Sequence, residues 1–374
     1  MQDASIRRFR FVGLLTVVAV YLLILVGGIV RSTGSGMGCP DWPKCFGTWV
    51  PPTHISQLPA NYKEIYTAQR VTKNQKLART LQRLGFSQVA GDIFSHPTQY
   101  IETDFNPVKT WIEYVNRVLG ALIGIFVFLT LLFALPFRRA DPAVFWLSMG
   151  SFLLTGVQGW LGSLVVSTNL LPIMVTIHMG LALVIVAMLL YAVDRVRQGR
   201  SGALHDGSAG KLQAGSLSHS TASLQLALWT VLLLTFVQIV LGTQVREEVD
   251  MVSAAADYAG RETWVAKLSG AFSLHRTFSA LVLLANVYVS YEVWQIGEKR
   301  LRRLVVAMLA LIGLEIAAGV ILAEFALPAI VQPVHLTLAT VLFGIQFLLL
   351  LAVRQVGKAG QMIAPKGAAQ RVVA

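Results

Sequence analysis

The stretch Leu274-His275-Arg276-Thr277-Phe278-Ser279-Ala280-Leu281 decides the fold of this chain, because it starts an apolar helix and yet carries a histidine and an arginine. Ionisable residues inside a membrane are costly, so they indicate a functional site. A second copy occurs earlier, as Val115-Asn116-Arg117-Val118-Leu119-Gly120-Ala121-Leu122, with asparagine in place of the histidine. Another histidine in an apolar run follows each copy, His178 after the earlier one and His335 after the later one. This recurrence predicts a duplicated helical unit.

Composition places the chain in a membrane. Of its 374 residues, 55% are hydrophobic and only 13% are charged, and the mean hydropathy is +0.63. A soluble domain carries about a quarter charged residues. Many of the basic residues behind the net charge of +12 lie in short segments between apolar runs, and these segments alternate along the chain. Such alternation is typical of cytoplasmic loops under the positive-inside rule, so we expect no nucleic-acid partner.

We predict an all-α membrane protein with eight transmembrane helices, arranged as two four-helix bundles related by a pseudo-two-fold axis. The expected organisation is a first span within residues 1–30, a long outer segment at 31–110, the rest of the N-terminal bundle at 111–193, a cytoplasmic linker at 194–222, the C-terminal bundle at 223–353 and a cytoplasmic tail at 354–374. The linker is rich in glycine, serine and alanine, which favours a flexible connection. We expect a multi-pass protein of the cell (inner) membrane with both termini in the cytoplasm.

Two more pairs of matching segments support the duplication. Gly27-Gly28-Ile29-Val30-Arg31 ends the first span as Gly242-Thr243-Gln244-Val245-Arg246 ends the fifth. Leu171-Pro172 precedes His178 as Leu327-Pro328 precedes His335. Matching segments in the same order indicate repeats that keep one orientation in the membrane.

Four special positions lie within about two helical turns of the outer ends of their spans, near one level: Asn116, His178, His275 and His335. Two histidines on facing helices of a four-helix unit can hold a haem iron from both sides. We therefore predict a haem held by His275 and His335, with Arg117 and Arg276 neutralising haem propionates. The alternative for each histidine is an interfacial or hydrogen-bonded residue. The arginine after the first special position of each half favours the haem interpretation.

Two acidic residues of the spans leave alternatives open. Glu113 precedes Asn116 by three residues and so shares its helix face. It is either a proton relay or general acid–base group at the mouth of a haem pocket, or a carboxylate stabilised by a helix N-terminus. Glu315 lies deeper, where a charge costs at least about 2.5–3.5 kcal/mol. It must face the protein interior, carry a proton or pair.

The only two cysteines lie in the outer segment, in Gly38-Cys39-Pro40-Asp41-Trp42-Pro43-Lys44-Cys45. Their spacing matches neither covalent haem attachment nor a C-x-x-C redox pair. An oxidising outer space favours a disulfide between Cys39 and Cys45, and the alternative is two unpaired thiols in a proline-rich turn. Further along the same segment, the apolar residues from Tyr62 to Phe86 have helical spacing.

Together these segments resemble the haem A synthase family. The stretch from Val26 to Cys45, the motif from Glu113 to Arg117, and the segments around His178, His275 and His335 fall where that family has its own motifs. The resemblance covers nearly the whole chain. It implies oxidation of the C8 methyl group of haem O to a formyl group, which yields haem A for terminal oxidases.

The resemblance also implies a role for each site residue. His275 and His335 match the ligands of a stably bound haem b in the C-terminal half, which would transfer electrons. His178 matches a ligand of the substrate haem in the N-terminal half, and Glu113 matches the glutamate that the family needs for activity. The two cysteines match the outer-loop pair of the family.

One residue departs from the family pattern Glu-x-x-His-Arg, because Asn116 stands at the histidine position. Asparagine is a poor iron ligand beside imidazole. Three interpretations follow: His178 alone holds the substrate haem and leaves one face open, a loop histidine (His54 or His96) supplies the second ligand, or this copy has lost the activity. We favour the first, because an open face suits oxygen chemistry.

The implied partners are haem O and haem A, a haem O synthase, cytochrome oxidase assembly factors and a membrane electron donor, and we leave a homo-oligomer open. Two other functions fit the sequence: a non-catalytic di-haem b-type membrane cytochrome, and a haem carrier. A single histidine in the N-terminal site speaks against firm binding of two haems.

Overall fold

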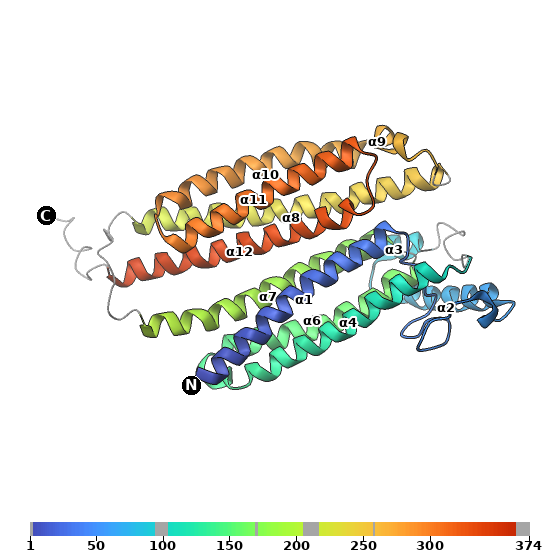
Figure 1. Cartoon of the computed structure of the whole chain (residues 1–374), viewed down its shortest axis with the longest axis horizontal. Coiled ribbons are helices and arrows are strands. Elements are labelled where there is room, and N and C mark those ends of the chain that lie inside the picture. Colours follow the sequence, from blue (N-terminus) through green and yellow to red (C-terminus); the bar gives the residue numbers. More distant parts are fainter. Residues whose placement is uncertain (1–2, 94–103, 169–170, 205–216, 257–258, 364–374) are drawn as a thin grey trace.

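The computed structural model describes residues 3–93, 104–168, 171–204, 217–256 and 259–363, which are almost all helical (Figure 1). The long helices are α1 (Asp3–Ser32), α2 (Tyr62–Arg83), α4 (Pro107–Ala134), α6 (Pro142–Ser167), α7 (Pro172–Leu204), α8 (Leu217–Ala255), α10 (Gly270–Gln295), α11 (Lys299–Glu324) and α12 (Val331–Ile363). Short helices fill the turns: η1 (Ile55–Gln57), α3 (Ser87–Asp92), α5 (Phe137–Ala140), η3 (Arg261–Thr263) and α9 (Trp264–Lys267).

Within the described residues, eight helices are long and apolar enough to cross a membrane, namely α1, α4, α6, α7, α8, α10, α11 and α12. This confirms the predicted all-α membrane protein with eight spans. Large apolar side chains point outward from these helices, for example Leu226 and Leu284, which are 69% and 67% exposed. In a polytopic protein such side chains face lipid rather than water.

The spans gather into two groups along the chain (Figure 1). In the first, α1, α4, α6 and α7 pack together, with a core that includes Val127, Val186 and Leu189. In the second, α8, α10, α11 and α12 pack around a core that includes Leu228 and Met308. The groups touch because α12 packs on both α1 and α7, and α7 also touches α8. The pseudo-two-fold relation between the groups stays a prediction.

Three helices extend into the segments predicted to be the linker and the tail. Helix α7 continues to Leu204 and α8 already begins at Leu217, so both enter the segment expected to be a linker, whose residues 205–216 lie outside the described residues. Helix α12 likewise continues to Ile363 in the expected tail. Hydropathy marks where apolar residues stop, whereas backbone hydrogen bonding continues through polar residues.

The long outer segment lies at one end of the stack of spans, opposite the end where α1 starts (Figure 1). The predicted helix in this segment is confirmed as α2. The segment returns to the spans at Asn106, whose side chain accepts a hydrogen bond from the backbone N–H of Lys109 at 3.1 Å, and Pro107 follows as the first helical residue. An asparagine cap followed by proline is a strong helix start, so α4 begins at a defined place.

Charged side chains join the two groups at both ends. At the end near α2, Arg31 of α1 and Arg246 of α8 both pair with Asp250, at 3.3 and 2.7 Å. At the opposite end, Asp194 of α7 accepts hydrogen bonds from Arg300 of α11 and from Gln355 of α12. Asp194 is only 4% exposed, so this second cluster is largely shielded from solvent.

We expect Asp194→Ala to destabilise the protein by about 1–3 kcal/mol, because it leaves the half-buried Arg300 without its carboxylate. The measurement is the thermal unfolding midpoint in detergent. Asp141→Ala is the matched control, since Asp141 pairs with the more exposed Arg195 inside the first group, and we expect a loss below about 1 kcal/mol. Equal midpoint shifts in the two variants would contradict the role given to Asp194.

Candidate functional site

The two histidines of the second group face each other. His275 on α10 and His335 on α12 have ring centroids 6.4 Å apart, with ring planes 75° from parallel. Imidazole–metal bonds are about 2 Å long, so two imidazoles on opposite sides of one iron have ring centres roughly 6 Å apart. The Nδ1 atom of His275 is buried and has no hydrogen-bond partner. The separation of the pair therefore fits two axial ligands of one haem.

A glycine on a neighbouring helix stands beside each of the four special positions. In the second group, an added Cβ at Gly242 would lie 3.5 Å from the His275 ring, and one at Gly319 would lie 3.6 Å from the His335 ring. In the first group, an added Cβ at Gly162 would lie 3.8 Å from the His178 ring, and one at Gly27 would lie 4.0 Å from the Asn116 amide oxygen. Each of these distances is an ordinary van der Waals contact, so the glycines mark places where a neighbouring helix packs closely on a special position, and they do so in both halves.

Polar residues that the sequence analysis missed hold the histidine helices in place. The Glu248 carboxylate, from the extension of α8, accepts hydrogen bonds from the backbone N–H groups of Ala271 and Phe272, at 2.9 and 3.2 Å. It thus caps the start of α10, close to His275. The amide of Gln238 donates to the backbone carbonyl of His275 at 3.1 Å. No local pattern marks these residues, because their partners lie on another helix.

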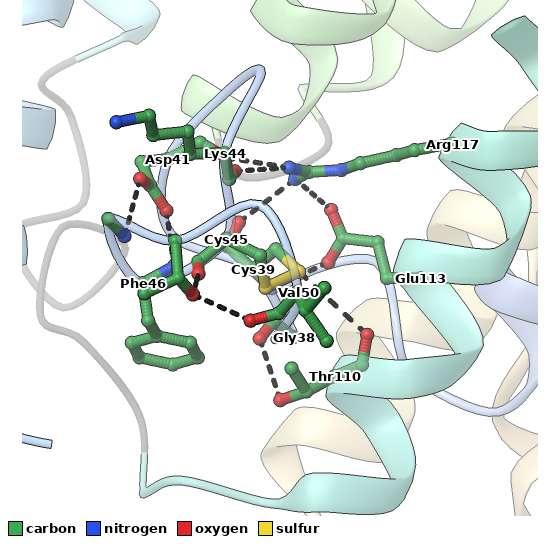
Figure 2. The surroundings of a disulfide bond; sticks show 12 residues. Gly38, Cys39, Asp41, Lys44, Cys45, Phe46, Val50, Thr110, Glu113 and Arg117 are labelled. Atoms are coloured by element: carbon green, nitrogen blue, oxygen red, sulfur yellow. Dashed lines mark hydrogen bonds and ion pairs between the residues drawn. A yellow bond between two sulfur atoms is a disulfide. The ribbon is translucent and has the colours of Figure 1, made fainter. Parts of the chain in front are cut away.

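In the first group, the outer loop covers Glu113 (Figure 2). Cys39 and Cys45 form the predicted disulfide, with an S–S distance of 2.03 Å, and both are fully buried. The backbone N–H of Cys39 donates to the Glu113 carboxylate at 2.8 Å, and the carboxylate also pairs with Arg117 one turn along α4. Glu113 is only 2% exposed. It is therefore a buried, oriented carboxylate rather than one that solvent surrounds at a helix end.

The Arg117 guanidinium is engaged by the same loop (Figure 2). It donates to the backbone carbonyls of Cys39, Asp41 and Lys44, at 3.1, 2.6 and 3.0 Å, besides its ion pair with Glu113. Its counterpart Arg276 is exposed, and within the described part of the chain its guanidinium has no polar partner. The propionate role expected for both arginines stays a prediction, and Arg276 is the one with free donors.

The remaining ligand candidates differ in their surroundings. The Nδ1 atom of His178 is buried without a hydrogen-bond partner, and so is the side-chain oxygen of Asn116. Of the two loop histidines, His54 is exposed, and its Nδ1 accepts from the backbone N–H of Ser56 at 3.2 Å to cap η1. His96 lies outside the described residues. Of the described histidines of the first group, His178 is the one that lies on a span, and its Nδ1 is buried without a hydrogen-bond partner.

Comparison with known proteins shows the family of the chain. Residues 10–83 and 91–347 match the model of the COX15-CtaA family, whose description is cytochrome oxidase assembly protein. The chain belongs to this family. This COX15-CtaA chain is similar to curated proteins named Heme A synthase from Shewanella oneidensis and Nitrosospira multiformis, at 28% and 29% identity over 49% and 53% of its length. Those matches cover 45% and 51% of the two relatives, so the chain spans about half the length of the curated relatives it matches first. A third Heme A synthase, from Bradyrhizobium sp. (strain ORS 278), is 25% identical over 75% of this chain and 73% of its own.

We expect His275→Ala and His335→Ala each to abolish the low-spin haem signal of the purified protein, because one imidazole cannot saturate the iron. Absorption and electron paramagnetic resonance spectra of protein from haem-replete cells measure this. His54→Ala is the control, since this exposed side chain caps only η1, and the signal should persist. An unchanged low-spin signal in both ligand variants would refute the assignment.

Proposed function

We propose that this protein is a haem A synthase, which oxidises the C8 methyl group of haem O to a formyl group. The facing pair of His275 and His335, with ring centres 6.4 Å apart, carries the proposal. Membership of a cytochrome oxidase assembly family and similarity to curated Heme A synthases support it. A haem b held by this pair would supply single-electron transfer, because an iron with two axial histidines has no open position for oxygen.

The first group of spans takes the substrate haem in this proposal. His178 is its ligand, and its buried, unpartnered Nδ1 supports that role. Asn116 leaves the opposite face open, since an amide is a poor iron ligand. His54 is exposed and caps η1 in the outer loop rather than lying on a span, which argues against its use as a replacement ligand.

Glu113 is the acid–base group of the proposal. The disulfide loop shields it from water, and Arg117 and the Cys39 N–H fix its orientation. An oriented carboxylate in a shielded site suits proton transfer better than a mobile, hydrated one. Arg117 therefore acts by fixing both the loop and Glu113.

The substrate enters from the bilayer in this proposal, because haem O is bulky and apolar. An open groove of about 530 Å³ lies between the end of α1, the outer loop and the start of α4, with almost wholly apolar walls that include Val26, Trp111 and Val115. It adjoins the Gly27–Asn116 contact along both helices. The proposal also places the protein in the inner membrane with cytoplasmic termini, among a haem O synthase, oxidase assembly factors and an electron donor.

The test is expression of the full chain in cells that make haem O but not haem A. We expect haem A among the pigments extracted and identified by mass. An empty vector is the control. Bound haem of unchanged mass would contradict the proposal, and it would favour a di-haem cytochrome if two haems bind firmly or a haem carrier if one does.

We expect Glu113→Gln to lower haem A production on the order of 10²-fold, because the amide keeps the size of the side chain but cannot move a proton. The low-spin signal of the C-terminal site should stay, which separates lost catalysis from lost folding. Glu324→Gln is the control, since it makes the same change at an exposed glutamate at the end of α11, and haem A production should stay unchanged. Undiminished haem A from Glu113→Gln would reduce Glu113 to a structural carboxylate.

A further inference from the structure

Glu315 lies near the middle of α11, in an apolar span, and its side chain is only 14% exposed. One carboxylate oxygen lies 2.8 Å from Nδ1 of His335, and the other is buried without a hydrogen-bond partner. The first contact is at ion-pair distance, but its angles are not those of a hydrogen bond. The Nδ1 atom of His335 therefore has no hydrogen-bond partner. A carboxylate at this depth is costly. The imidazole of His335 is the group that accounts for its presence.

Among the described residues, the first group of spans has no such contact. Gln158 on α6 precedes His178 by the same number of residues as Glu315 precedes His335, and a glycine four residues further along faces the ring in both halves. The Gln158 amide donates to the backbone carbonyl of His178 at 2.9 Å, and the Nδ1 atom of His178 has no partner. The two halves therefore match in position and differ in charge beside the ligand histidine.

The geometry points to Glu315 as a positioning residue that acts through His335 and lowers the reduction potential of the haem held in the C-terminal half. This inference rests on the proposed function. An Nδ1–H that donates to Glu315, from which Nδ1 lies 2.8 Å, leaves Nε2 as the ring nitrogen that can bind the iron. The partner of one ring nitrogen determines which nitrogen binds a metal.

The electronic consequence follows from the same contact. A carboxylate that accepts a hydrogen bond from a ligand imidazole raises the basicity of that ligand. A more basic axial ligand and a nearby negative charge both favour the oxidised iron. Because Gln158 supplies neither, we expect the C-terminal haem to be the stronger electron donor of the two.

Redox titration of the purified holoprotein at fixed pH tests this inference. We expect Glu315→Gln to keep the low-spin spectrum of two axial histidines and to raise the reduced-to-oxidised ratio of that haem about tenfold at a given ambient potential, which is about 59 mV for one electron. Glu315→Asp keeps the charge one carbon further away, so its potential should lie between those of the wild type and Glu315→Gln. An unchanged potential in Glu315→Gln would overturn the inference.

The reverse change keeps the inference testable if Glu315→Gln fails to hold haem. We expect Gln158→Glu to lower the potential of the N-terminal haem, because it places a carboxylate at the equivalent position. No downward shift there would overturn the inference. The pigment analysis distinguishes the two proposals: haem A formation with potentials indifferent to Glu315 refutes only this role, whereas a shifted potential without haem A refutes only the synthase.

Discussion

Polar side chains inside the eight spans have no water to bond, and this constraint governs how the protein is held together. Thr16 on α1 hydrogen-bonds Thr130 on α4 at 2.8 Å, and both are fully buried. Gln346 on α12 donates to Asn286 on α10 at 2.9 Å, again between fully buried residues. Apolar contacts give little preference for one helix rotation over another in lipid. These polar contacts between helices therefore set the rotation of the spans, and with it the direction in which the histidines point.

The two halves place their glycines alike but differ in the polar and charged groups around the special positions. A glycine of a neighbouring helix lies beside each of the four special positions, two in each half. The surroundings of the charged groups do not recur. Arg117 is engaged by loop carbonyls whereas Arg276 is exposed, and Gln158 stands where the second half has Glu315. The two halves thus share this placement of glycines but differ in charge beside the special positions.

The outer loop covers Glu113 and also contributes hydrogen bonds to Glu113 and Arg117. The disulfide closes a short loop whose backbone donates to Glu113 and accepts from Arg117. Gly38 is needed for this arrangement, because an added Cβ would lie 2.6 Å from the backbone carbonyl oxygen of Lys109. The loop thus packs against the first turn of α4, and any disturbance of the loop reaches Glu113 directly.

The sequence by itself determined the number of spans, their approximate limits and the disulfide pair, and it predicted the duplication and the special positions. Hydropathy, spacing and repeated motifs are patterns along one dimension, so a chain displays them before it folds. Only the tertiary structure decided how four contacts form. Glu315 pairs with His335, and the outer loop engages Arg117. Glu248 caps α10, and Arg31 shares Asp250 with Arg246. Each of these contacts joins one helix or loop to another, except the Arg246–Asp250 pair, which lies within α8. Their contact depends on how packed helices are rotated against one another, and no local pattern encodes that rotation.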